Sequence, residues 1–125
     1  MTGWHISVFR QEEAAAKPAS PDPVKGARLA VWQADDEGLA WIQALVKSGD
    51  AIDLGSDGYP SLYTAPTKHL IPTIIKGPPA ARETWFYEAG DILTDQWAGK
   101  TIVDKKTIKL CKPDEWLIVE AWDES

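Results

Sequence analysis

The chain has 125 residues, of which 44% are hydrophobic and 26% charged, and its formal net charge is −6 at pH 7. This size and balance are typical of one globular domain and disfavour an intrinsically disordered chain. The acidic charge, without a strong Lys/Arg cluster, disfavours direct binding of nucleic acid. No apolar stretch is long enough to span a bilayer, so we expect a soluble protein without membrane contact.

Two further features bear on the cellular compartment. The amino terminus reads Met-Thr-Gly-Trp-His and lacks the basic start and apolar stretch of a secretory signal. Cys111 is the single cysteine, so no disulfide can form within the chain. Both features favour a cytoplasmic protein, because the cytosol keeps thiols reduced.

The first part of the chain is predicted to form a hairpin with a long connection. Residues 4–10 alternate apolar and polar side chains, as in a half-buried strand, and residues 27–34 form a second predicted strand. Between them, residues 11–26 hold a run of three alanines and three prolines, which exclude a helix interior or a central strand. We therefore expect a mobile Ala/Pro-rich loop within a single domain that spans residues 1–125.

The best-defined predicted helix covers residues 36–47. Its apolar residues repeat at helical spacing and define one buried face. Asp35 and Asp36 are suited to cap its start, and Gly49 is suited to end it. We expect this helix to be the main one that packs against the sheet.

Two shorter helices are predicted later in the chain. The first runs from Thr67 to Lys76, and Pro72 should kink it or divide it into two short turns. The second begins after Asp104, whose carboxylate can cap it, and it places Cys111 on its apolar side. A buried structural thiol is therefore favoured over a catalytic nucleophile at this position.

Further strands are predicted at residues 82–88 and 116–122. The second is apolar on both faces, which is typical of a strand in the middle of a sheet. Together the elements predict an α+β fold, in which a mainly antiparallel sheet of four to five strands packs against one main helix. Two or three short helices complete the fold.

The chain is rich in tryptophan, with seven in 125 residues. Tryptophan can bury one side of its ring and still offer an N–H group to a partner. Most of the seven should lie in the core, and a few should line a recognition surface. We include Trp97 among the expected contact residues.

A turn at Asp57-Gly58 forms the second expected recognition element. It presents Tyr59 and Tyr63, and tyrosines beside a flexible turn are good contact residues, although packing at the sheet edge is the alternative. The same stretch has acids at two positions of a calcium loop, but Gly55 and Thr64 replace two required ligands, so no metal is expected. The expected partner-binding residues are Asp57, Tyr59, Tyr63 and Trp97.

Glu120 is unusual because it lies within an otherwise apolar strand. A carboxylate in a sheet needs a partner, and an ion pair with Arg28 or Arg82 would supply one. The alternative is a general base in a small-molecule pocket. That pocket would be lined by Tyr59, Tyr63, His69 and Glu120.

No motif for a nucleophile, a nucleotide or a metal is present, so we expect no cofactor and disfavour an enzyme. The leading hypothesis is a small acidic binding protein of the immunity-factor, inhibitor or adaptor type. It would engage a protein partner, with a basic one favoured by charge, through an acidic, aromatic-bearing surface. The alternatives are a small-molecule-binding enzyme that uses the pocket near Glu120 and an accessory subunit that self-associates through surface aromatics.

Overall fold

The computed structural model describes residues 3–12, 18, 24–34, 37–55, 61–75, 86–88 and 102–123. The strands are β1 (Trp4–Gln11), β2 (Lys25–Ala34), β3 (Ile52–Asp53), β4 (Ser61–Pro66), β5 (Phe86–Glu88), β6 (Ile102–Asp104) and β7 (Trp116–Asp123). The helices are α1 (Ala40–Ser48), α2 (Thr67–Ile75) and α3 (Lys105–Ile108).

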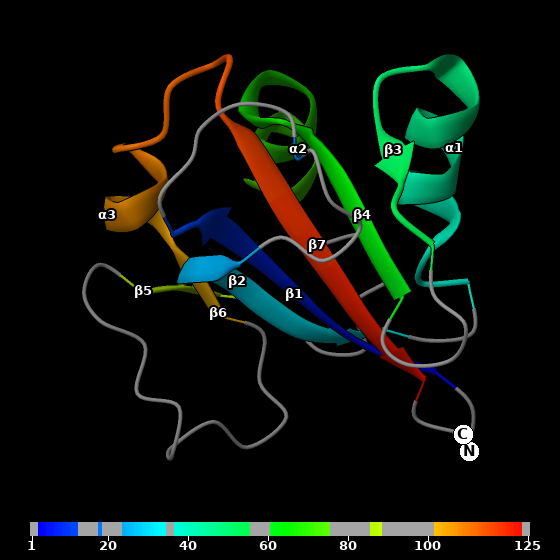
Figure 1. Cartoon of the computed structure of the whole chain (residues 1–125). Coiled ribbons are helices and arrows are strands. Elements are labelled where there is room, and N and C mark those ends of the chain that lie inside the picture. Colours follow the sequence, from blue (N-terminus) through cyan, green and yellow to red (C-terminus); the bar gives the residue numbers. More distant parts are fainter. Residues whose placement is uncertain are drawn as a thin grey trace.

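The described strands form one seven-stranded sheet in the order β3-β4-β7-β1-β2-β6-β5 (Figure 1). Neighbouring strands are antiparallel except β5 and β6, which are parallel. The predicted α+β class and mainly antiparallel sheet are therefore confirmed, whereas the predicted four to five strands are too few. The prediction of one main helix is also wrong, because α1 and α2 have nine residues each. The sequence pattern does not predict β3, β4 or β6. Strands β3 and β6 have two and three residues, which is too short for an alternating pattern, and β4 is buried on both faces, so its residues do not alternate.

The predicted hairpin is present, because β1 and β2 pair in an antiparallel ladder. The ladder continues to the pair Gln11 and Lys25, and the N–H of Glu12 donates to the carbonyl of Val24 at 3.1 Å. Strand β2 thus begins two residues earlier than expected. The mobility expected for residues 11–26 concerns mainly positions 13–17 and 19–23, which lie outside the described residues.

Helix α1 is shorter than the predicted helix at residues 36–47. It begins after Leu39, which offers no side-chain cap, and Glu37 to Leu39 form a turn that includes Gly38. Because glycine is unfavourable inside a helix, Gly38 is consistent with the later start of α1. The end is as predicted: Gly49 adopts a left-handed conformation (φ 89°), and its N–H donates to carbonyls of the last turn. Asp35 and Asp36 lie outside the described residues.

Helix α2 is continuous across Pro72, so the expected division into two short turns does not occur. Proline has no N–H group, so the helix lacks the hydrogen bond from residue 72 to the carbonyl of Lys68. Both residues are exposed, so water can donate a hydrogen bond to that carbonyl. Burial of Leu70 and Ile74 in the core holds the helix on the sheet. Thr67 does not cap the helix; its hydroxyl and its N–H both donate to the carbonyl of Glu115.

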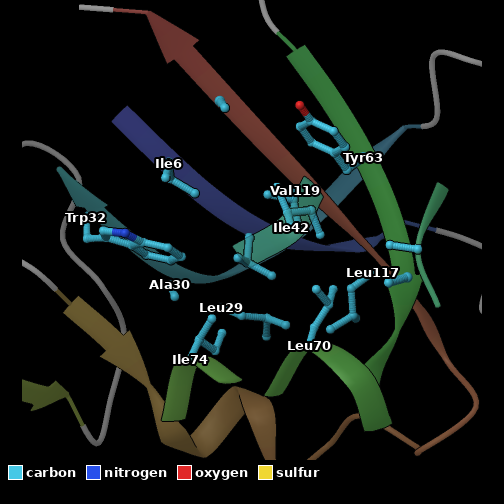
Figure 2. Packing of buried hydrophobic residues seen from close by; sticks show 14 of the residues in the cluster. Ile6, Leu29, Ala30, Trp32, Ile42, Tyr63, Leu70, Ile74, Leu117 and Val119 are labelled. Carbon is cyan, nitrogen blue, oxygen red and sulfur yellow. The ribbon is translucent and has the colours of Figure 1, made fainter. Parts of the chain in front are cut away.

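The main core lies between the sheet and the helices, and Figure 2 shows part of it. Trp32 of β2 is completely buried there, with its ring centroid 6.0 Å from that of Trp41 in α1. Val31 and Ile118 are also completely buried, but they alternate with core residues and therefore lie on the opposite face of the sheet. The centre of the sheet is thus buried on both faces, as predicted for β7.

A two-pronged ion pair connects β1 to the segment before β7. Nε and Nη2 of Arg10 donate to the two carboxylate oxygens of Glu115 at 2.7 and 3.0 Å. Glu115 is only 4% exposed, and its carbonyl also accepts from Thr67 at the start of α2. The hydrogen bond from Arg10 lowers the pKa of Glu115, because it stabilises the charged carboxylate.

We expect acid to remove part of the stability that this pair supplies. Because the pKa of Glu115 is lower in the folded than in the unfolded chain, the contribution is complete above the ordinary glutamate pKa of about 4.3 and is lost as pH falls through the folded pKa. Glu115→Gln should lower the free energy of unfolding at pH 7 by about 1–3 kcal/mol. Urea titrations from pH 7 to pH 3 should also show a weaker pH dependence for this variant.

The matched control is Asp114→Asn. Asp114 pairs with Lys68 at 3.4 Å, but its side chain is 89% exposed, so loss of its charge should change stability by less than about 0.5 kcal/mol. Equal acid sensitivity of the wild type and Glu115→Gln would show that this ion pair does not contribute to stability.

Candidate functional site

Alternation along β7 defines a second side of the sheet. Leu117, Val119 and Ala121 belong to the core cluster that also contains Leu70 and Ile74 of α2. The alternate side chains of β7 therefore point away from α2. We call this side the Glu120 face; the β7 residues on it are Trp116, Ile118, Glu120 and Trp122.

Glu120 is 8% exposed, and each of its carboxylate oxygens has a donor. Lys25 forms an ion pair with Oε2, and the indole N–H of Trp122 donates to Oε1 at 3.1 Å. The ammonium of Lys25 lies over the ring of Phe9, 5.7 Å from its centroid, on the way from β2 to β7. The predicted partnering of Glu120 is therefore present, but its partner is Lys25 and not Arg28.

The sequence did not indicate Lys25, because β2 starts earlier than its alternating pattern suggests. Lysine reaches across a neighbouring strand with its flexible four-carbon chain, so the pair depends on strand register and not on spacing in the sequence. Arg82, the other predicted partner, lies outside the described residues.

Trp122 is the described tryptophan that is most open to solvent, at 41% exposed. Trp32 is buried, and Trp4, Trp41 and Trp116 are half-buried. Strand β7 pairs with β1 as far as Asp123 and with β4 as far as Ala121, and the indole N–H of Trp122 donates to Glu120. Trp122 is therefore an exposed aromatic ring that a hydrogen bond connects to its own strand. In the sequence, the signal for an exposed Trp122 was its position at the end of an apolar strand, just before the charged residue Asp123.

The structure does not bring His69 and Glu120 together, so the predicted pocket that contains both is not formed. His69 belongs to α2 on the core side of the sheet, whereas Glu120 points to the opposite side. Nε2 of His69 lies 3.7 Å from Oδ1 of Asp50, whose other oxygen accepts from Ser48 at 3.0 Å. His69 therefore connects α2 to the end of α1.

Tyr63 lies in the core cluster and is 5% exposed (Figure 2). Burial raises its pKa, and the nearby charge of Asp53 acts in the same direction. Its ring therefore packs in the core and offers little area to a partner. The other three predicted contact residues, Asp57, Tyr59 and Trp97, lie outside the described residues.

Cys111 follows α3, which Asp104 caps as predicted by accepting from the N–H of Thr107 at 3.1 Å. The thiol is half-buried and donates to the carbonyl of Thr107 at 3.8 Å. Burial raises its pKa to about 11, and Glu115 adds to this effect while Arg10 opposes it. Since a nucleophilic cysteine requires the thiolate, these surroundings favour a structural role.

We expect Cys111 to react slowly with iodoacetamide in the folded protein. At pH 8 a thiol with a pKa of about 11 is almost entirely protonated, whereas the unfolded thiol, with a pKa of about 8.5, is partly ionised. Alkylation followed by mass spectrometry should be at least about tenfold slower in buffer than in 8 M urea, even though the less acidic thiolate is more nucleophilic. Equal rates would contradict the raised pKa.

Across the described segments, no group of three His, Cys, Asp or Glu side chains is arranged to hold a metal ion. None of the helices in the described part of the chain is long and apolar enough to cross a membrane. Comparison with models of known protein families, with curated proteins and with solved structures gives no match for this chain. The Glu120 face is therefore the main basis for an inference about function.

Proposed function

We propose that the protein is a small, acidic, non-enzymatic binding protein of the immunity-factor, inhibitor or adaptor type. It engages a macromolecular partner through an acidic, aromatic-bearing surface, with Trp122 as the aromatic anchor. The main support is that the indole of Trp122 is 41% exposed and yet is oriented by a hydrogen bond to Glu120.

This arrangement favours binding for two physical reasons. Tryptophan is enriched among the few residues that supply most of the affinity of protein interfaces. A side chain that is already ordered loses less conformational entropy on binding. Lys25 and Glu120 supply that order here, because their ion pair holds the carboxylate that accepts from the indole.

The charge of the protein favours a basic partner. The net charge is −6 over the whole chain, and several described acids are exposed. These exposed acids are Glu12, Glu37, Asp53 and Asp114. An acidic surface attracts a basic partner at long range and raises the association rate.

The remaining expectations fit the same proposal. Asp57, Tyr59 and Trp97 stay candidate contact residues of the same surface, whereas the ring of Tyr63 is buried. Lone Cys111 forms no disulfide within the chain, which favours the cytoplasm as the compartment in which the partner is met.

Trp122→Ala tests the anchor. Immobilised wild-type protein is used to isolate a partner from an extract of the source cells, and the affinity of the purified partner is measured by calorimetry. We expect Trp122→Ala to weaken binding by about 30-fold or more, which is typical of a central interface residue. The melting temperature should fall only moderately, because the ring is not part of the core cluster, although Glu120 loses one hydrogen-bond donor.

Leu110→Ala is the matched control, since Leu110 is also a large exposed apolar residue, at 65%. It should leave the affinity unchanged. Binding of the wild type should also weaken as NaCl is raised from 50 to 500 mM, because screening reduces charge attraction. Equal affinities of the two variants would contradict the role of Trp122, and salt-independent binding would contradict the acidic surface.

A further inference from the structure

Positive charge is concentrated in one short segment of this acidic chain. Of its thirteen Lys and Arg residues, four fall at positions 105, 106, 109 and 112, although the net charge of the whole chain is −6. All four are exposed, on α3 and the turn that follows it. Hydrogen bonds continue the helical coil beyond α3, because the N–H groups of Lys109, Leu110 and Cys111 donate to carbonyls three or four residues earlier.

This coil has a buried side and an exposed side. Ile108 belongs to the core cluster, and Cys111, three residues later, packs against it. Lys106, Lys109 and Leu110 are three and four residues apart and therefore share the opposite side. Leu110 is 65% exposed. We call the exposed side the lysine patch; its residues are Lys106, Lys109, Leu110 and Lys112.

The acids close to the lysine patch in the sequence already have other partners. Asp104 is 4% exposed and accepts from the N–H and the hydroxyl of Thr107. Glu115 pairs with Arg10, and Asp114 pairs with a lysine of α2. Among the residues that the structure describes, no acid forms an ion pair with a lysine of the patch. The patch therefore presents its positive charge to solvent.

We propose that the lysine patch is a second docking surface, and that its partner is an acidic protein segment with an apolar side chain. Carboxylates of the segment pair with the lysines, and its apolar side chain packs on Leu110. The methylene chains of Lys106 and Lys109 extend the apolar area on this side of the coil.

This goes beyond the proposed function, because it assigns a partner of opposite charge at a different place on the fold. Trp122 pairs with His5 near the start of β1, whereas α3 packs on β2. In Figure 1, α3 lies at the left of the sheet and β7 ends at the lower right. The two surfaces can therefore be occupied independently.

The side chains of the patch favour a protein segment over a nucleic acid. Surfaces that bind nucleic acid combine positive charge with aromatic or arginine side chains that stack on bases, whereas this patch has lysines and a leucine. The acids elsewhere on the chain repel a long polyanion. They act less on a short segment, because charges beyond about 8 Å are largely screened at physiological salt.

The probe for this surface is the synthetic peptide acetyl-Gly-Asp-Glu-Leu-Asp-Glu-Leu-Gly-amide. It is titrated into ¹⁵N-labelled protein in 50 mM NaCl, and the amide signals are followed by nuclear magnetic resonance. We expect saturable shifts at residues 105–112, with half-saturation on the order of 1 mM for several weak charge pairs and one apolar contact. The indole N–H signal of Trp122 should not move.

Two charge reversals separate the patch from the total charge of the protein. Lys109→Glu changes the patch at the end of α3. Lys47→Glu is the matched control, since Lys47 is an exposed lysine in the last turn of α1, which packs on the edge strand β3. Both variants lower the net charge equally, but Lys109→Glu should weaken peptide binding about fivefold or more and Lys47→Glu less than about twofold.

Two altered peptides test the two kinds of contact. A peptide with Asn and Gln in place of Asp and Glu should bind at least about tenfold more weakly, because it has no charge to pair with the lysines. A peptide with Ser in place of Leu should bind about threefold more weakly. Leu110→Ser should have a similar effect on the original peptide, because it removes the same apolar contact.

The patch is excluded if the peptide shifts no signals at residues 105–112, or if the two charge reversals weaken binding equally. Equal binding of the neutral peptide would exclude charge recognition, and equal binding of the Ser peptide would exclude the apolar contact. A short oligothymidylate that binds the patch more tightly than the peptide would replace the protein segment by a nucleic acid. None of these outcomes involves the partner of Trp122, so the proposed function and this surface can fail separately.

Discussion

The burial of β7 on both faces is the constraint on which the rest of the structure depends. Between β4 and β1, this strand places apolar side chains both in the core and on the Glu120 face. A charged group on such a strand has little contact with water, so a neighbouring group of opposite charge must neutralise it. The ion pair between Glu120 and Lys25 meets this need, and it determines in turn how Trp122 is held. Packing in the middle of the sheet thus leads directly to an ordered aromatic ring at its surface.

The elements that could be predicted from the sequence are those with a long repeating pattern. Alternating or continuous apolar residues identified β1, β2 and β7, and helical spacing identified α1 and α2. The pattern did not show β3 and β6, because strands of two or three residues contain too few positions, and it did not show β4, because that strand is buried on both faces and does not alternate. The predicted start of α1 was also too early, because Asp35 and Asp36 indicated a cap there, whereas residues 37–39 form a turn and the helix begins at Ala40.

The site was less predictable, because its contacts join residues that are far apart in the sequence. The need of Glu120 for a partner follows from its apolar neighbours, but the choice of Lys25 depends on the register of β2 against β1. The separation of Glu120 from His69 depends on which side of the sheet α2 covers. Neither the register of β2 against β1 nor the side of the sheet that α2 covers can be recognised from neighbouring residues in the sequence. The burial of Tyr63 has the same origin, since it depends on which face of β4 meets the helices.

The pairing of β1 with β7 also has a consequence for the order of folding events. Arg10 and Glu115 are 105 residues apart, yet their strands lie side by side in the centre of the sheet. This ladder can form only after the long stretch of chain between β1 and β7 has been closed into a loop. Closing the loop costs conformational entropy before any contact between the two strands offsets that cost. The hairpin of β1 and β2 and the two main helices therefore have to wait for β7 before the core is complete. During synthesis, the edge of β1 that pairs with β7 would remain unpaired until residues 117–123 have been made, which is when assistance by a chaperone would matter most.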